Sequence, residues 1–181
     1  MESVGFKEWS LVCDALGRGE QSIILRKGGI AEGRGGFSFR HREFFFFPTF
    51  FHEQMEKVRN APRELPKQNS KVTISLYAIV GETMRVDSMN IAEALAPLHV
   101  LTPEVVRERF LYKGRGLNVA LVRVFRFERP WILANEARYG GCRSWVDLPE
   151  PPSLALEPVI DDRIHLTRQE QFRAACHPGR S

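Results

Sequence analysis

The run of four phenylalanines at Phe44–Phe47, directly followed by Pro48, constrains the fold of this chain more than any other feature. Successive side chains of a strand point to opposite sides of a sheet, so a strand that is apolar at every position has to be buried on both faces. Proline has no backbone N–H to donate to a neighbouring strand and therefore ends such a run. We predict a central strand over residues 43–47 that stops at Pro48.

The rest of the pattern predicts more strands and several short helices. Further strands are indicated at residues 21–27, 37–40, 71–86 and 117–127. In 71–86 the alternating apolar residues are expected to share one face, and Pro130 is expected to close the strand before it. Helices are expected over residues 6–16, 49–58, 90–96, 103–112 and 167–176. Thr102 and Pro103 form the start of one of them, and Thr167 to Glu170 matches a capping box at the start of the last.

These elements predict an α+β fold with a mostly antiparallel or barrel-like sheet and peripheral helices. The chain has 181 residues, of which 43% are hydrophobic, and this is enough for one domain with an appendage. We expect a single domain over residues 1–148. Residues 149–181 are expected to form a proline-rich linker and a short C-terminal helix.

The charge composition favours an anionic partner. The formal net charge is +4, and only six of the 26 basic residues are lysines, which leaves 20 arginines. The planar guanidinium group of arginine suits bidentate contacts with phosphates and bases, so RNA or DNA is the partner that the composition favours. A genome of high GC content would also favour arginine codons, and this alternative stays open.

Several other classes of protein are disfavoured by the sequence. Three cysteines without close spacing do not indicate a disulfide framework or a zinc knuckle, and we expect no metal and no cofactor. No segment approaches the roughly 18 apolar residues needed to span a bilayer, so we expect no membrane association and a cytoplasmic location. None of the common signatures of nucleotide-driven or zinc-hydrolytic chemistry occurs.

The first candidate site is a basic segment at a glycine turn. Arg26 and Lys27 directly precede Gly28 and Gly29, and backbone amides in such a turn can form a nest for a phosphate or carboxylate. Two further cations, Arg40 and Arg42, are expected on one face of the same hairpin, with aromatic residues on the other. A basic, glycine-rich hairpin of this kind can bind nucleic acid, although an ordinary hairpin with solvated cations explains the same pattern.

Two further groups of residues can carry chemistry. His52 and Glu53, after the aromatic strand, are candidates for an acid–base pair, or for residues at a helix terminus. Later in the chain, Tyr139 and Trp145 can line a base pocket or pack in the core, and Arg143 adds a cation. Between them, Cys142 can be a nucleophile if it is exposed beside arginines, or a buried structural residue.

Four blocks of the sequence resemble one bacterial family, the domain of unknown function DUF1802. The first three are Lys7–Glu8–Trp9, the stretch from Gln21 to Ile30, and Phe47–Pro48–Thr49–Phe50 with His52 and Gln54. The fourth is Gly141–Cys142–Arg143–Ser144–Trp145–Val146. The blocks extend over about residues 5–148, and the family implies no established activity. The layout is also similar to the pseudobarrel folds of the PUA, ASCH and EVE group, which implies binding of RNA or a modified base.

Three functions are therefore considered. The first is a small nucleic-acid-binding module in which Arg26, Lys27 and the following hairpin grip phosphates. The second is a metal-independent enzyme acting on an anionic substrate, with His52 and Glu53 as acid–base groups that converge with the Arg26–Lys27 turn. The third is an interaction protein of a defence or regulatory system. We prefer the first.

Overall fold

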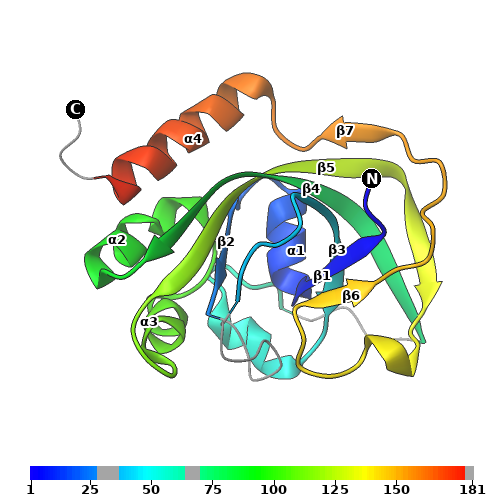
Figure 1. Ribbon diagram of the computed structural model, residues 1–181, viewed down its shortest axis with the longest axis horizontal. Coiled ribbons are helices and arrows are strands. Elements are labelled where there is room, and N and C mark those ends of the chain that lie inside the picture. Colours follow the sequence, from blue (N-terminus) through cyan, green and yellow to red (C-terminus); the bar gives the residue numbers. More distant parts are fainter. Residues whose placement is uncertain (28–36, 64–69, 178–181) are drawn as a thin grey trace.

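The computed structural model describes residues 1–27, 37–63 and 70–177, which form a curved sheet around a short helix (Figure 1). The seven strands of the described chain are β1 (Val4–Trp9), β2 (Ile23–Arg26), β3 (Glu43–Thr49), β4 (Lys71–Val86), β5 (Leu117–Ala134), β6 (Trp145–Asp147) and β7 (Leu156–Pro158). Their order is β2-β5-β4-β3-β1-β6, and β7 pairs with β5. The pairing of β1 with β3 is parallel and every other described pairing is antiparallel. The predicted α+β fold with a mostly antiparallel sheet is confirmed.

The predicted central strand is also confirmed. β3 lies between β1 and β4, and its four phenylalanines are all buried. Phe44 and Phe46 face the main core around α1 (Ser10–Gly17), whereas Phe45 and Phe47 pack in a smaller cluster on the other face of the sheet. The strand extends through Pro48 to Thr49, two residues beyond the predicted end.

The first helix begins later than predicted, because residues 4–9 form β1. The apolar spacing in residues 6–16 fits a helix, but pairing with β3 over Gly5 to Trp9 makes its first part a strand. α1 starts at Ser10, where the buried side chain of Gln54 satisfies two donors. Its Oε1 accepts hydrogen bonds from Ser10 Oγ and from the backbone N–H of Leu11, each at 3.1 Å.

The two longest strands, β4 and β5, pair with a bulge between them, and the residues of β4 on either side of it pack in different hydrophobic clusters. The register passes from Leu76–Arg126 to Ile74–Trp131, so that residues 127–130 of β5 oppose Ser75 alone. The prediction that Pro130 ends the strand is wrong: Pro130 lies in the bulge, where a proline can occupy an unpaired position, and β5 continues to Ala134. The expectation of one apolar face along β4 is wrong for the same reason: Ile74 belongs to the smaller cluster and Leu76 to the main core.

The other helices are α2 (Met89–Ala94), α3 (Pro103–Leu111), α4 (Asp162–Cys176) and the short 3-10 segments η2 (His52–Lys57), η3 (Ala96–Leu98) and η4 (Ala137–Tyr139). The helices α2, α3 and α4 each contribute residues to the main core. The predicted start of α3 at Pro103 is confirmed, although Thr102 makes no side-chain capping bond. No helix in the described ranges is long and apolar enough to cross a membrane.

Three expectations about local structure are wrong. Residues 37–40 form no strand, and β2 pairs with β5, so the predicted basic hairpin is not formed by the described residues. Thr49 does not cap a helix, because its hydroxyl donates to the carbonyl of Glu8 at 3.0 Å. The capping box at Thr167 lies inside α4, which begins after Asp161, whose carboxylate accepts from Ile164 N–H at 2.7 Å.

The C-terminal segment packs on the sheet. β7 pairs with β5 next to α4, and Phe172 and Cys176 are buried in the main core. α4 also contacts α2, as Figure 1 shows at the upper edge of the sheet. The sequence-based division at residue 148 stays a prediction.

Candidate functional site

Residues from five separate segments line a cleft where β1, β2 and the end of β3 meet α3 and the loop before β6. We call it the basic cleft; it has a volume of about 410 Å³ and is lined by five cations, Lys7, Arg26, Lys27, Arg109 and Arg143. The other lining residues are Trp9, Leu25, Thr49, Phe51, Gly141, Cys142 and Ser144. No acidic side chain is among the described residues that line it. The arrangement therefore concentrates positive charge beside aromatic surface.

Arg109 is the most deeply placed of these cations. It donates to the carbonyl of Leu25 at 2.9 Å, and its guanidinium carbon lies 4.3 Å from the ring centroid of Trp9. The pKa of Arg109 is lowered to about 10, mainly by burial; the negative charge of Glu8 opposes this, and the nearby charge of Arg26 adds to it. The buried carboxylate of Glu8 is thus close to the cleft but does not line it.

Arg26 and Lys27 are adjacent in sequence but contact different parts of the structure. The guanidinium of Arg26 donates to the carbonyl of Lys7 and lies 4.7 Å from the ring centroid of Phe6. The ammonium of Lys27 donates to three carbonyls after and within α3, those of Phe110 at 3.3 Å, Gly114 at 2.7 Å and Gly116 at 2.9 Å. Lys27 therefore holds the loop after α3, and Arg26 is the member of the pair that faces β1.

The rim of the basic cleft is formed by the loop before β6. Gly141 has φ +80°, a left-handed conformation that glycine adopts readily, and its carbonyl accepts from the ammonium of Lys7 at 2.9 Å. The turn leaves Cys142 and Arg143 exposed. Burial lowers the pKa of Lys7, and the charge of Arg143 lowers it further, against the opposing effect of Cys142. In the described part of the chain, Arg143 has no hydrogen bond or ion pair.

Two partly exposed aromatic rings form the wall of the basic cleft. The rings of Trp9 and Phe51 meet edge to face, with centroids 5.2 Å apart. Lys57 also lies over Trp9, at 5.9 Å from its centroid. Aromatic rings beside cations are the combination with which proteins hold unpaired bases and their phosphates.

Several predicted site residues lie elsewhere. Arg40 and Arg42 are exposed and do not line the basic cleft; Arg40 donates to His41 at 3.2 Å. Gly28 and Gly29 lie outside the described residues. His52 and Glu53 are exposed at the start of η2 and do not line the cleft either, so the structure does not bring them together with Arg26.

The two predicted base-pocket aromatics are buried. Trp145 is 7% exposed and packs against Phe6, Phe37 and Phe44, with ring centroids 4.9 to 6.2 Å apart. This matches the core interpretation of Trp145. Tyr139 is also buried, although it lines a hollow next to the cleft, and its hydroxyl accepts from Arg138 at 2.9 Å.

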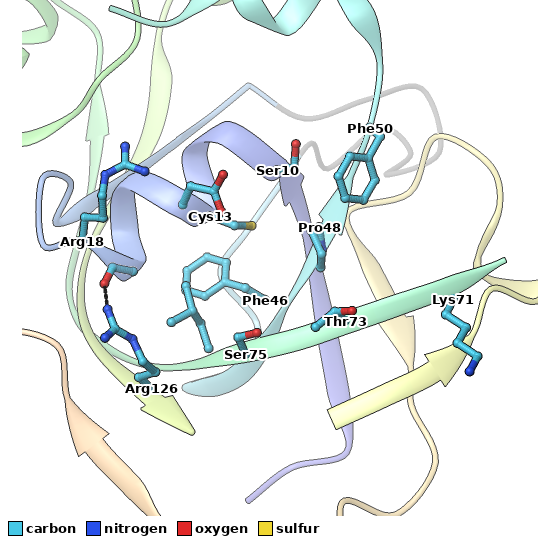
Figure 2. A pocket seen from close by; sticks show the side chains of 13 residues that line it. Ser10, Cys13, Arg18, Phe46, Pro48, Phe50, Lys71, Thr73, Ser75 and Arg126 are labelled. Atoms are coloured by element: carbon cyan, nitrogen blue, oxygen red, sulfur yellow. Dashed lines mark hydrogen bonds between the residues drawn. The ribbon is translucent and has the colours of Figure 1, made fainter. Parts of the chain in front are cut away.

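A second pocket, of about 460 Å³, lies between α1 and β4 (Figure 2). We call it the helix–strand pocket. Thr73 and Ser75 line it from β4, and Ser10 and Cys13 line it from α1. Thr73 and Ser75 have short polar side chains, and Ser75 lies opposite the bulge of β5. Its apolar wall consists of Phe46, Pro48, Phe50 and Leu76.

A third hollow, of about 370 Å³, joins these two. We call it the bridging hollow, and it contains Lys7 and Thr49 from the basic cleft and Pro48, Phe50 and Lys71 from the helix–strand pocket. The only carboxylate among its described lining residues is Glu136, which is bonded to Arg138 at 3.1 Å. The three spaces are thus neighbours along the segment 48–51.

Sequence reasoning missed Lys7, Trp9, Phe51 and Arg109 as residues of the site. The block Lys7–Glu8–Trp9 was visible as part of the family resemblance, and Phe51 follows another such block. For Arg109 no sequence signal exists, since it is one of several charged residues on α3. Only the packing of α3 against β2 places it in the cleft.

Comparisons with known proteins give one family and one group of structures. A family model described as "Domain of unknown function (DUF1802)" matches residues 5–171. No curated protein matches the chain. Among solved structures the chain is similar to ASCH from Zymomonas mobilis, with a TM-score of 0.49 and 11% identity over 93% of this chain and 94% of that chain. A serine-to-alanine mutant of that protein has a TM-score of 0.49 and 11% identity. A tyrosine-to-phenylalanine mutant has a TM-score of 0.47 and 12% identity. Each of these two comparisons covers 83% of this chain and 92% of the mutant chain.

Proposed function

This chain belongs to the DUF1802 family, whose description states no activity, and we propose from its own cleft that it is a small nucleic-acid-binding module. The observation that carries the proposal is the convergence of five cations around two aromatic rings without a lining carboxylate in the described residues. Phosphate groups are the anions that such a cluster suits, and unpaired bases are the groups that exposed aromatic rings hold.

The electrostatics of the basic cleft support an anionic ligand. The pKa of Arg109 and that of Lys7 are both lowered, first by burial and then by a neighbouring cation. The charged form of each of these two groups is therefore less stable in the cleft than it would be in water. A bound phosphate reverses the effect of the like charges, so binding of an anion stabilises the charged cleft.

The cations of the basic cleft differ in the roles that we propose for them. Arg143 is exposed at the rim and is the first group that an approaching phosphate meets. Arg26, Lys7 and Arg109 lie further inside, and each already donates to a backbone carbonyl with part of its donor capacity. Lys27 supports the site by holding the loop after α3.

The alternative of an enzyme with His52 and Glu53 as acid–base groups gains no support from their position. It requires these side chains to meet the anion-binding residues, and both are exposed on η2 away from the lining of the basic cleft.

The proposal is tested by fluorescence anisotropy with labelled RNA and DNA at about 50 and 200 mM salt. We expect affinity to fall steeply with salt. Arg143→Ala is expected to weaken binding to all sequences alike and to reduce the salt slope by about one unit. The matched control is Arg163→Ala, since Arg163 is an exposed arginine on α4 that lines none of the three hollows. Binding that does not respond to salt, or an Arg143 variant equal to the control, would refute the proposal.

A further inference from the structure

The three hollows share their walls and follow one another along the chain segment that leaves β3. Pro48 and Phe50 line the helix–strand pocket and the bridging hollow, Thr49 lines the bridging hollow and the basic cleft, and Phe51 lines the basic cleft. The three hollows are therefore neighbours along this segment of four residues, and we call the three together the groove.

The groove is basic from end to end. The basic cleft contributes its five cations, Lys71 lies in the shared wall of the other two hollows, and Arg18 and Arg126 line the far end. The acidic side chains among its described lining residues are two, Asp14 and Glu136. Burial raises the pKa of Asp14, which is to say that its negative charge is disfavoured there. Eight cations and two carboxylates line the groove. Arg18 is also paired with Glu20, at 2.9 Å, and the remaining excess of positive charge is complementary to a polyanion.

The far end of the groove has a different chemistry from the basic cleft. In the helix–strand pocket, Phe46 and Leu76 form an apolar floor, and the hydroxyls of Thr73 and Ser75 stand on one side (Figure 2). Phe50 is partly exposed at its edge, next to the bridging hollow. A flat heteroaromatic group with polar edges fits apolar walls that carry a few hydroxyl groups.

We propose that the groove takes a single strand of nucleic acid several nucleotides long, with its phosphates in the basic cleft and one unpaired base in the helix–strand pocket. This inference rests on the proposed function and adds to it the path, the strandedness and a base site. A duplex keeps its bases stacked and paired, so its bases cannot enter a hollow of this size, whereas those of a single strand can. Phe50 and Phe51, on successive positions of the segment 48–51, supply the aromatic surface along the path.

The experiment is a length series with the unmodified full chain. Labelled oligouridylates of two, four, eight and twelve nucleotides, and a twelve-base-pair duplex, are titrated by fluorescence anisotropy at about 50 mM salt. We expect affinity to rise at least about tenfold from two to eight nucleotides and then to level off, and the duplex to bind at least about tenfold more weakly than the longest single strand.

Two variants locate the path. Lys71→Ala and Phe50→Ala are expected to weaken binding of the octanucleotide about fivefold or more and to leave binding of the dinucleotide in the basic cleft unchanged. Arg163→Ala is again the matched control. Equal affinity for two and eight nucleotides, or tighter binding of the duplex, overturns the groove but leaves the nucleic-acid-binding module intact. Absence of binding to every probe at low salt overturns the proposed function and the groove with it.

Discussion

Acidification should destabilise the fold through one buried histidine, His99. Its side chain is 2% exposed, and its ring Nδ1 accepts a hydrogen bond from the backbone N–H of Leu101 at 3.1 Å. The ring Nε2 is buried and has no partner among the described residues. Because Nδ1 acts as an acceptor, a second proton on the ring would break this hydrogen bond.

Burial and, to a smaller extent, the positive charges of Arg59 and Arg109 together lower the pKa of His99 to about 3. In the unfolded chain the same ring has a pKa of about 6.5. Between these two values the unfolded state binds one proton that the native state does not, so the free energy of unfolding decreases as the pH falls below about 6.5. The slope is about 1.4 kcal/mol per pH unit, and the loss between pH 7 and pH 5 is ~2 kcal/mol.

The assay is urea denaturation at pH 7 and pH 5, for the wild type and for His99→Asn, whose side-chain oxygen can accept from Leu101. The variant has no titrating ring, so the loss of stability on acidification is expected to be smaller by ~2 kcal/mol than in the wild type. His52→Asn is the matched control, because His52 is exposed, and it should keep the pH dependence of the wild type. Equal losses in wild type and His99→Asn would refute the reasoning.

Three further predictions concern single side chains. Lys27→Met removes three hydrogen bonds to the loop after α3 and is expected to lower the free energy of unfolding by ~2 kcal/mol in urea; a change below ~0.5 kcal/mol would contradict this. Gln54→Leu leaves two donors at the start of α1 without an acceptor and should cost ~2–4 kcal/mol, visible as a clear fall in Tm, with an unchanged Tm as the contrary outcome. Cys142 is exposed and should react rapidly with a thiol reagent in the native protein, whereas burial raises the pKa of Cys13 and Cys176, which should react only on unfolding. Cys142→Ser should abolish the rapid reaction, and a rapid reaction that remains in this variant would show that a buried thiol is accessible.

Local patterns predicted the elements whose conformation is determined by their own residues. The four phenylalanines of β3 require burial on both faces in any fold, and Pro103 suits the first turn of a helix wherever that helix packs. Residues 6–9 show the limit of such reasoning. The spacing of Phe6 and Trp9 fits a helix, and only the parallel pairing with β3 makes this segment a strand.

The bulge in β5 shows a second limit. Pro130 was expected to end the strand, because a proline cannot donate within a ladder of hydrogen bonds. The four residues 127–130 lie opposite one residue of β4 without pairing with it, and the pairing with β4 resumes at Trp131. β4 extends to Lys71, which pairs with Ala134, so the length of this partner strand determines that β5 continues past Pro130.

The sequence by itself showed which kinds of residue form the site and which of its segments resemble the family. Its arginine-rich charge, its aromatic central strand and the segments around Lys7, Arg26 and Arg143 are all visible without coordinates. Only the tertiary structure decided which cations meet. Arg26 and Arg143 are more than a hundred residues apart, and they share a cleft because β2 and the loop before β6 are both positioned by one curved sheet. Local sequence patterns describe neighbours along the chain, whereas a binding site is formed by strand pairings and helix packing between segments that are distant in sequence.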